Sequence, residues 1–165
     1  MKPIVHSRRA TVLLLCISLA LAVATAASAQ TEAQAKLDSI TLQAGMHNIR
    51  AEVARSPLQT QTGMMFRTNI AENEGMIFVF PYPHQASFWM KNTLVPLSAA
   101  YLDSEGVILE IHNLEPHNTN AVKAASENVQ YVLETSQGWF KRKNITPGTL
   151  VRTEKGTLRK TFFRQ

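Results

Sequence analysis

The feature that most constrains this chain is an unbroken apolar run from Met76 to Phe80, closed by Pro81-Tyr82-Pro83. The run has the length of a strand but lacks the alternation of a strand with one wet face. It therefore predicts a strand that is buried on both faces. The rest of the domain has to be built around that strand.

The remaining patterns predict further short strands and little helix. Residues 99–102 and 107–112 flank four turn formers, Asp103 to Gly106, and predict a hairpin. Ser56-Pro57 predicts the start of a short helix ending near Met65, and Ser136 the start of another around Trp139. The other expected strands are 37–43, 46–53, 86–92, 129–134, 150–152 and, at an edge, 157–163. We predict a mainly β fold, a small barrel-like or strongly curved antiparallel or mixed sheet with one or two short helices.

The N-terminus has the pattern of a secretory signal peptide. Lys2, Arg8 and Arg9 precede an apolar stretch, which ends in Ala27-Ser28-Ala29. The strongly apolar part, residues 12–24, is shorter than the roughly 20 residues that a membrane span needs. We expect residues 1–29 to be a signal peptide, 30–37 a flexible leader of the mature chain, and 38–165 one β domain with a basic C-terminal edge strand or tail from 152. The protein would be periplasmic or secreted, with no membrane span after cleavage.

Cysteine and charge narrow the function classes. Cys16 is the only cysteine and lies in the predicted signal, so the mature chain has neither a disulfide nor a cysteine nucleophile. Removing the three basic signal residues leaves 14 basic residues against 12 acidic ones, a weak bias that argues against a nucleic-acid partner. The late basic residues are Lys141, Arg142, Lys143, Arg152, Lys155, Arg159, Lys160 and Arg164.

The stretch richest in chemical groups is Ser87 to Leu97, which contains Phe-Trp-Met-Lys-Asn-Thr. On a strand, Trp89 and Lys91 would share one face, and Phe88 and Asn92 the other. Trp89 beside Lys91 suggests a cation–π pair or a patch that faces a ligand. The alternatives are that both aromatic rings pack in cores and that the lysine stem only covers apolar surface.

Other candidates surround this stretch. Arg67 could form an ion pair with Glu74 or hold an anionic ligand with its planar fork. Glu134 ends an apolar strand, and if buried it would need a partner such as Arg67 or Lys91.

Metal and catalytic motifs are absent from the sequence. Glu110 and His112 share a strand face, but no third metal ligand has a suitable spacing, so we predict no metal site. The chain also lacks the common hydrolase and nucleotide-binding motifs, and it identifies neither a cofactor nor an oligomeric state.

Several segments, in order, resemble the domain-of-unknown-function 192 family. They are Gly63-Met64-Met65-Phe66-Arg67-Thr68, Glu74 to Phe80, Phe88 to Leu97, and Tyr101 to Ile108. The resemblance covers residues 49–151 and implies a compact, mostly β, barrel-like domain that is often exported, without an agreed activity. The family positions carried over are Arg67, Glu74, Gly75, Trp89, Met90, Lys91, Asn92, Thr93 and Pro96. Ser98 stands where many members have aspartate, which puts any role of that aspartate in doubt here.

Three hypotheses of function follow. The first is an exported protein that binds a small ligand or an envelope partner near Arg67, Trp89, Lys91 and Asn92. The second is an enzyme acting on a small, planar molecule in a barrel mouth, assisted by Glu110, His112 or Glu134. The third is an envelope interaction module that uses the basic tail. A pocket beside Trp89 favours the first two, and a carboxylate in it with a shifted pKa favours the enzyme.

Overall fold

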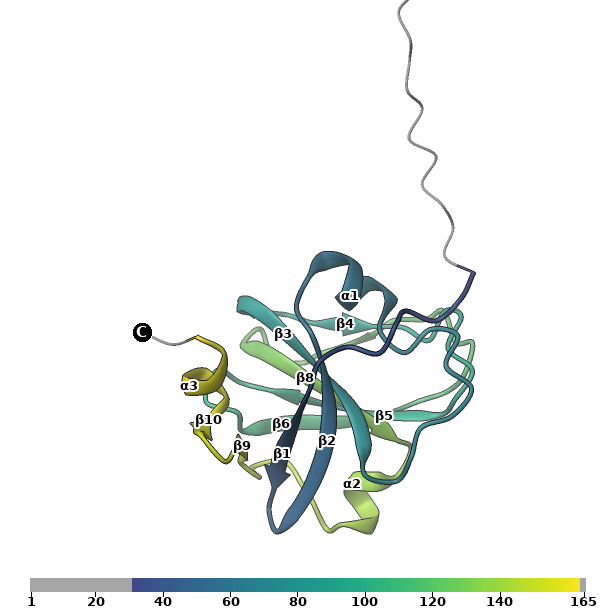
Figure 1. Cartoon of the computed structure of the whole chain (residues 1–165). Coiled ribbons are helices and arrows are strands. Elements are labelled where there is room, and N and C mark those ends of the chain that lie inside the picture. Colours follow the sequence, from purple (N-terminus) through teal and green to yellow (C-terminus); the bar gives the residue numbers. More distant parts are fainter. Residues whose placement is uncertain (1–30, 164–165) are drawn as a thin grey trace, which may run out of the picture.

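The computed structural model describes residues 31–163, which form a strongly curved sheet with short helices around it (Figure 1). The predicted signal peptide lies outside the described residues. The strands are β1 (Ser39–Ala44), β2 (His47–Ala54), β3 (Glu74–His84), β4 (Ser87–Phe88), β5 (Leu97–Leu102), β6 (Ile108–Leu114), β7 (Val122–Lys123), β8 (Val129–Ser136), β9 (Val151–Thr153) and β10 (Gly156–Thr157). The helices are α1 (Pro57–Thr62), α2 (Trp139–Arg142) and α3 (Leu158–Phe162).

Eight strands form one mixed sheet in the order β10-β9-β1-β2-β3-β8-β5-β6, and β4 pairs with β7 separately. Only β2 and β3 are parallel, and α1 lies in the connection that this pairing requires. The ends of the sheet approach each other through a single antiparallel bridge between Val107 and Leu150. The prediction of a mainly β, strongly curved sheet is confirmed, although the sheet is not a closed barrel and the described chain has three helices rather than two.

The sheet separates two apolar cores. Side chains alternate across each strand, so Ile77 and Val79 of β3 enter one core while Met76 and Phe78 enter the other. The central strands β3, β8 and β5 are therefore apolar on both faces, as the unbroken run from Met76 to Phe80 predicts. The first core is closed by the helices α2 and α3. The second is closed by the turn after α1 and by the chain around β4.

Gly75 is fixed by the close approach of β3 to its neighbours. It pairs with Ala51 on one side and Thr135 on the other. A Cβ on this residue would collide with the Glu134 carbonyl oxygen and lie 3.3 Å from Ile49 Cδ1. The glycine of the Glu-Gly-Met segment therefore serves backbone packing, because no larger residue leaves this part of the sheet undisturbed.

Two local predictions were wrong. The strand expected over 86–92 is limited to Ser87–Phe88, and the chain turns at Lys91-Asn92. The edge strand expected over 157–163 is a helix after its first residue, because Thr157 caps it by accepting a hydrogen bond from the Lys160 amide. Phe162 then packs against Tyr131 of the sheet, with ring centroids 6.0 Å apart. Tertiary packing and a cap thus override a weak strand pattern.

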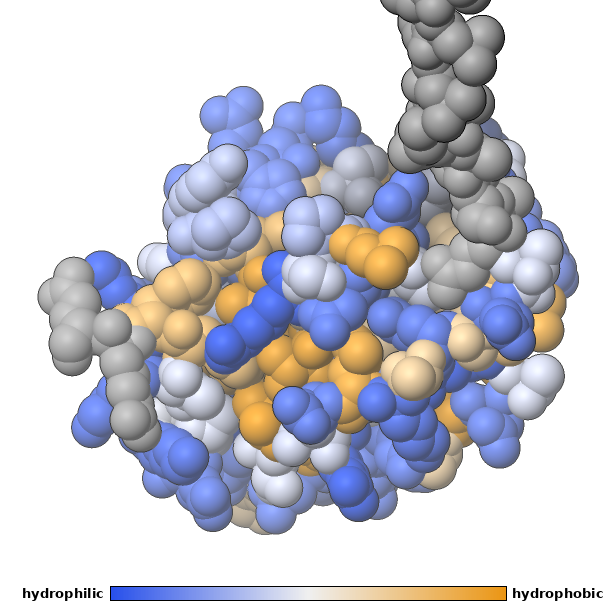
Figure 2. Space-filling view, turned by 45° about the horizontal axis from the view of Figure 1, so that its top comes forward, coloured by the Kyte–Doolittle hydropathy of each residue, from blue (hydrophilic) through white to orange (hydrophobic). Residues whose placement is uncertain are grey.

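The surface combines polar side chains with some apolar ones. Ile40, Val53 and Phe162 pack against the first core but are only half-buried. The space-filling view shows apolar surface gathered in the middle of one face, between polar side chains (Figure 2). Residues 31–38 carry no helix or strand, yet the Gln34 amide nitrogen donates to the carbonyls of Gln59 in α1 and of Gly63 directly after it. None of the described helices has the length and apolar character needed to cross a membrane.

Candidate functional site

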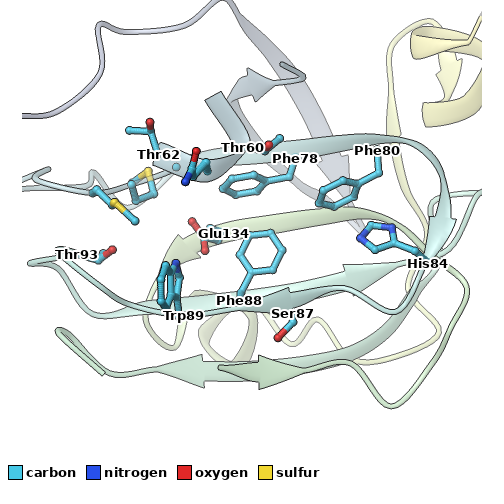
Figure 3. A pocket seen from close by; sticks show the side chains of 14 residues that line it. Thr60, Thr62, Phe78, Phe80, His84, Ser87, Phe88, Trp89, Thr93 and Glu134 are labelled. Atoms are coloured by element: carbon cyan, nitrogen blue, oxygen red, sulfur yellow. The ribbon is translucent and has the colours of Figure 1, made fainter. Parts of the chain in front are cut away.

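A cavity of about 240 Å³ opens on the side of the second core, between β3, β8 and the chain that covers them (Figure 3). The sheet contributes Phe78, Phe80 and Glu134, and the cover contributes the end of α1, β4 and the turn after it. The lining residues are Thr60, Gln61, Thr62, Gly63, Met64, Met65, Phe78, Phe80, His84, Ser87, Phe88, Trp89, Thr93 and Glu134. We refer to this cavity as the aromatic pocket.

Glu134 carries the one carboxyl group among the described residues of the lining. Strand alternation on β8 places it on the same face as Val132, so it points into the second core and the pocket. Only 4% of the residue is exposed, and none of the described residues forms a hydrogen bond or ion pair with its carboxyl. This burial raises the pKa of Glu134 to about 8 from its ordinary value of 4.5. The group is therefore mostly uncharged at neutral pH.

Phe88 is the centre of a group of aromatic rings. Its ring meets those of Phe78 and Tyr101 edge to face, with centroids 4.8 and 6.0 Å away. Phe80 lies 6.5 Å from Phe88 and 4.5 Å from His84. Such edge-to-face pairs stabilise the packing by about 1 kcal/mol each beyond the burial of their area. They form the apolar walls of the pocket and fix its shape.

Trp89 forms the lip of the pocket and is 45% exposed. Lys91 lies outside with its Nζ over the indole, 5.4 Å from the ring centroid. The predicted pairing of these side chains is therefore present, although the strand alternation used to predict it is not. Phe88 packs inward while Trp89 remains half in solvent, so one ring serves the core and the other the opening.

Three loops that hydrogen bonds join beside the pocket each contain a residue in a left-handed backbone conformation. Phe66, Asn92 and His117 have φ angles of 61°, 57° and 61°. The Phe66 amide donates to the Asn92 carbonyl at 2.8 Å, and the His117 amide donates to the Thr93 carbonyl at 3.2 Å. This conformation disfavours residues with a Cβ, least so asparagine. Its clustering here indicates strain that the surrounding hydrogen bonds maintain.

Arg67 has a structural partner that the sequence did not suggest. Its two terminal nitrogens contact the two carboxylate oxygens of Glu52 on β2, at 2.7 and 2.8 Å. The prediction of an Arg67–Glu74 ion pair is thus wrong. The prediction that Arg67 or Lys91 pairs with a buried Glu134 is wrong as well. Glu74 instead borders a separate polar hollow with Lys36 and Arg50. The Arg67–Glu52 pair holds the segment after α1, one wall of the pocket, against the sheet.

Ser98 is buried away from the pocket. Its hydroxyl donates to the Asn113 side chain at 2.7 Å and accepts from the Gly138 amide at 2.9 Å. It therefore connects β5, β6 and the start of α2. In this chain the position has a structural role that a hydroxyl fully satisfies.

Glu110 and His112 form a contact outside the pocket lining. His112 Nε2 lies 2.7 Å from one oxygen of Glu110, and the other oxygen accepts from the Ala125 and Ser126 amides. Burial opposes ionisation of Glu110, but these hydrogen bonds outweigh it and lower its pKa. The pair anchors the loop before β8. Within residues 31–163, no three His, Cys, Asp or Glu side chains converge as a metal site would require.

Two of the candidate site residues that the sequence suggests, Trp89 and Glu134, line the pocket. Ser87, Phe88 and Thr93 of the lining also lie in the segment from Ser87 to Leu97, whereas the other lining residues were not indicated as parts of a site. Phe78 and Phe80 were interpreted only as a buried strand, although alternation within that strand sends them to one face. Thr93 and Met64 reach the pocket through turns whose conformation no periodicity predicts. Among Arg67, Lys91 and Asn92, none belongs to the lining. These three residues instead contact the segments that line the pocket.

Comparison with known proteins gives a family and two similar structures. A family model described as uncharacterized ACR, the domain of unknown function 192, matches residues 40–153. A crystal structure from Sinorhizobium meliloti, named as that of a candidate transcription regulator, is 31% identical with a TM-score of 0.69, over 72% of this chain and 96% of that one. A protein of unknown function from Novosphingobium aromaticivorans is 31% identical with a TM-score of 0.68, over 76% and 94%. No curated protein matches the chain.

Replacing Asn92 tests the strained turn. Asn92→Ala should lower the free energy of unfolding by about 1 kcal/mol, because alanine tolerates a φ of 57° less well. Asn92→Gly, which relieves the steric cost, should lose much less. Urea unfolding measures both. Equal losses would show that the side chain, not the backbone conformation, matters here.

The raised pKa of Glu134 predicts how stability depends on pH. The folded protein keeps the Glu134 proton up to about pH 8, while the unfolded chain releases it near 4.5. The stabilisation is therefore complete below the lower value and is lost as pH rises to the upper one, by up to about 1.4 kcal/mol per pH unit. In urea unfolding, the wild type should lose stability relative to Glu134→Gln across this range. A constant difference between the two would contradict a buried, uncharged Glu134.

Proposed function

Because the chain belongs to the domain-of-unknown-function 192 family, which is uncharacterised, we propose a function from its own geometry. The protein is an exported binding protein that takes a small organic molecule into the aromatic pocket. One observation carries the proposal, namely a buried carboxyl group without a partner that faces an open cavity with apolar walls. Natural ligand sites combine such walls with a few convergent polar groups.

The size of the cavity supports a ligand built around one ring or a short branched chain. A cavity of about 150 Å³ is enough for benzene, and the aromatic pocket has about 240 Å³. The half-exposed Trp89 can cover such a ligand at the opening. The edge-to-face packing around Phe88 keeps the pocket shaped before a ligand arrives, which lowers the entropy lost on binding.

Binding has more support than catalysis. The described lining offers a carboxyl, the His84 imidazole and the Ser87 hydroxyl. The Ser87 side chain points away from His84 in Figure 3, so it is not placed as a base-activated nucleophile would be. Glu110 and His112, the other candidates for acid–base chemistry, anchor a loop instead. Transcription regulation, suggested by the name of one relative, has little support in a mature chain whose basic and acidic residues nearly balance.

Export is the part of the proposal that rests on residues 1–29, with their basic start, apolar stretch and Ala-Ser-Ala end. The intact mass of the protein isolated from its own host measures this. We expect a chain that begins at Gln30. A mature protein that retains residues 1–29 would contradict export by this route.

Methionine methyl groups provide a direct test of ligand binding. Met64 and Met65 line the pocket, while Met46 is 91% exposed at the opposite turn between β1 and β2. In protein labelled with ¹³C at its methionine methyls, titration with the neutral probe benzyl alcohol should shift the signals of Met64 and Met65 and leave Met46 unchanged. The shifts should saturate.

Two variants act as test and control. Trp89→Ala should weaken benzyl alcohol binding roughly fivefold, the equivalent of about 1 kcal/mol for one lost aromatic contact. Leu94→Ala removes a side chain that is similarly exposed but does not line the pocket, and it should leave binding unchanged. Shifts that are absent, or that spread equally to Met46, would refute the proposal.

A further inference from the structure

We propose that the aromatic pocket selects small organic ammonium ions, with the Glu134 carboxylate as the counter-charge. This inference rests on the proposed function and specifies its ligand class. The cage around the cation would consist of Phe78, Phe88 and Trp89, which surround the Glu134 carboxyl in Figure 3.

The charges in the lining favour a cation over an anion. Among the described residues that line the pocket there is no lysine or arginine. Lys91 contacts the outer side of Trp89, and Arg67 is occupied by Glu52. The lining therefore has no fixed positive charge to attract an anion, whereas Glu134 can supply a negative charge.

The aromatic walls point to the same class. The face of an aromatic ring carries partial negative charge and attracts an ammonium group, most strongly when water is excluded. Phe78 and Phe88 are held at right angles, so that their different orientations enclose the space beside the carboxyl. A neutral ring would also gain apolar contact here, but it would offer no charge to pair with an ionised Glu134.

An ammonium ion also resolves the missing partner of Glu134. A buried carboxylate without a counter-ion is strongly disfavoured, and the carboxyl takes up a proton instead. A bound cation would reverse this preference, so that Glu134 ionises and its proton leaves to solvent as the ligand enters. Binding should therefore tighten as the pH rises.

Few other titratable groups face Glu134. On β3, His84 lines the same pocket. On β5, the pKa of the Tyr101 phenol is raised first by burial and second by the nearby charge of Glu134. The adjacent strand positions, Met76 and Ala99, carry no charge. The covering segment from Thr60 to Met65 contributes none either, and neither does Trp89. Among the described residues that line the pocket, Glu134 and His84 are thus the two titratable side chains.

The test compares three probes of similar size, namely benzylammonium, benzyl alcohol and benzoate. Binding is followed through the Met64 and Met65 methyl signals. Benzylammonium should bind at least tenfold more tightly than benzyl alcohol near pH 8, and benzoate should not bind. The affinity for benzylammonium should rise nearly tenfold per pH unit from about pH 5.5 to about 7.5, because ionised Glu134 becomes more abundant. The ammonium group of the probe stays charged over this range, since alkyl ammonium groups titrate near pH 10.

Glu134→Gln keeps the shape of the side chain and His84, and it removes the titrating carboxyl. This variant should lose both the preference for benzylammonium and most of the rise with pH, while still binding benzyl alcohol. If the rise persists in Glu134→Gln, His84 controls it and the inference fails. If wild type binds benzyl alcohol as tightly as benzylammonium, the ammonium inference fails and the proposed pocket function stands. If neither benzylammonium nor benzyl alcohol shifts the Met64 and Met65 signals, the ammonium inference and the proposed pocket function both fail.

Discussion

A carboxyl group on a strand covered on both faces is the constraint around which the candidate site is organised. Because β8 lies between β3 and β5, each of its side chains enters one of two apolar cores. Glu134 enters the second core and has no partner among the described residues. A hydrophobic side chain at this position would fill the core more favourably. The sheet therefore buries a carboxyl group, at a cost in stability, at the place where the covering layer leaves an opening.

The covering layer is built to keep that opening. The segment after α1 is held to the sheet by the Arg67–Glu52 ion pair and to the next loop by the Phe66–Asn92 hydrogen bond. The same turn places Thr93 and Trp89 at the pocket. The residues of the Phe-Trp-Met-Lys-Asn-Thr segment thus have different roles: Phe88 packs in the core, Trp89 lies at the opening and Asn92 forms the strained turn. Strain and unpaired polar groups concentrate where function is expected.

Periodicity predicted the sheet better than the site. The run from Met76 to Phe80 and the hairpin around Gly106 led to a curved β fold, because strand alternation and turn residues are local signals. Ser56-Pro57 likewise predicted α1, whose capping box the structure contains. The pocket depends on contacts between distant segments, such as Phe78 with Phe88. The pairing of Arg67 with Glu52 also joins separate segments of the chain. The residue type of Arg67 alone therefore suggested an anionic ligand or Glu74 as its partner.

The protonation of Glu134 tests the account most directly. In protein labelled with ¹³C at the glutamate carboxyls, the Glu134 signal can be assigned by its loss in Glu134→Gln and followed as the pH is raised. The account predicts an uncharged carboxyl at neutral pH, with a midpoint near the pKa of about 8, and a shift to the ionised form when benzylammonium is added. A midpoint near the ordinary 4.5 would mean that water or another group solvates the carboxylate, and it would contradict the account.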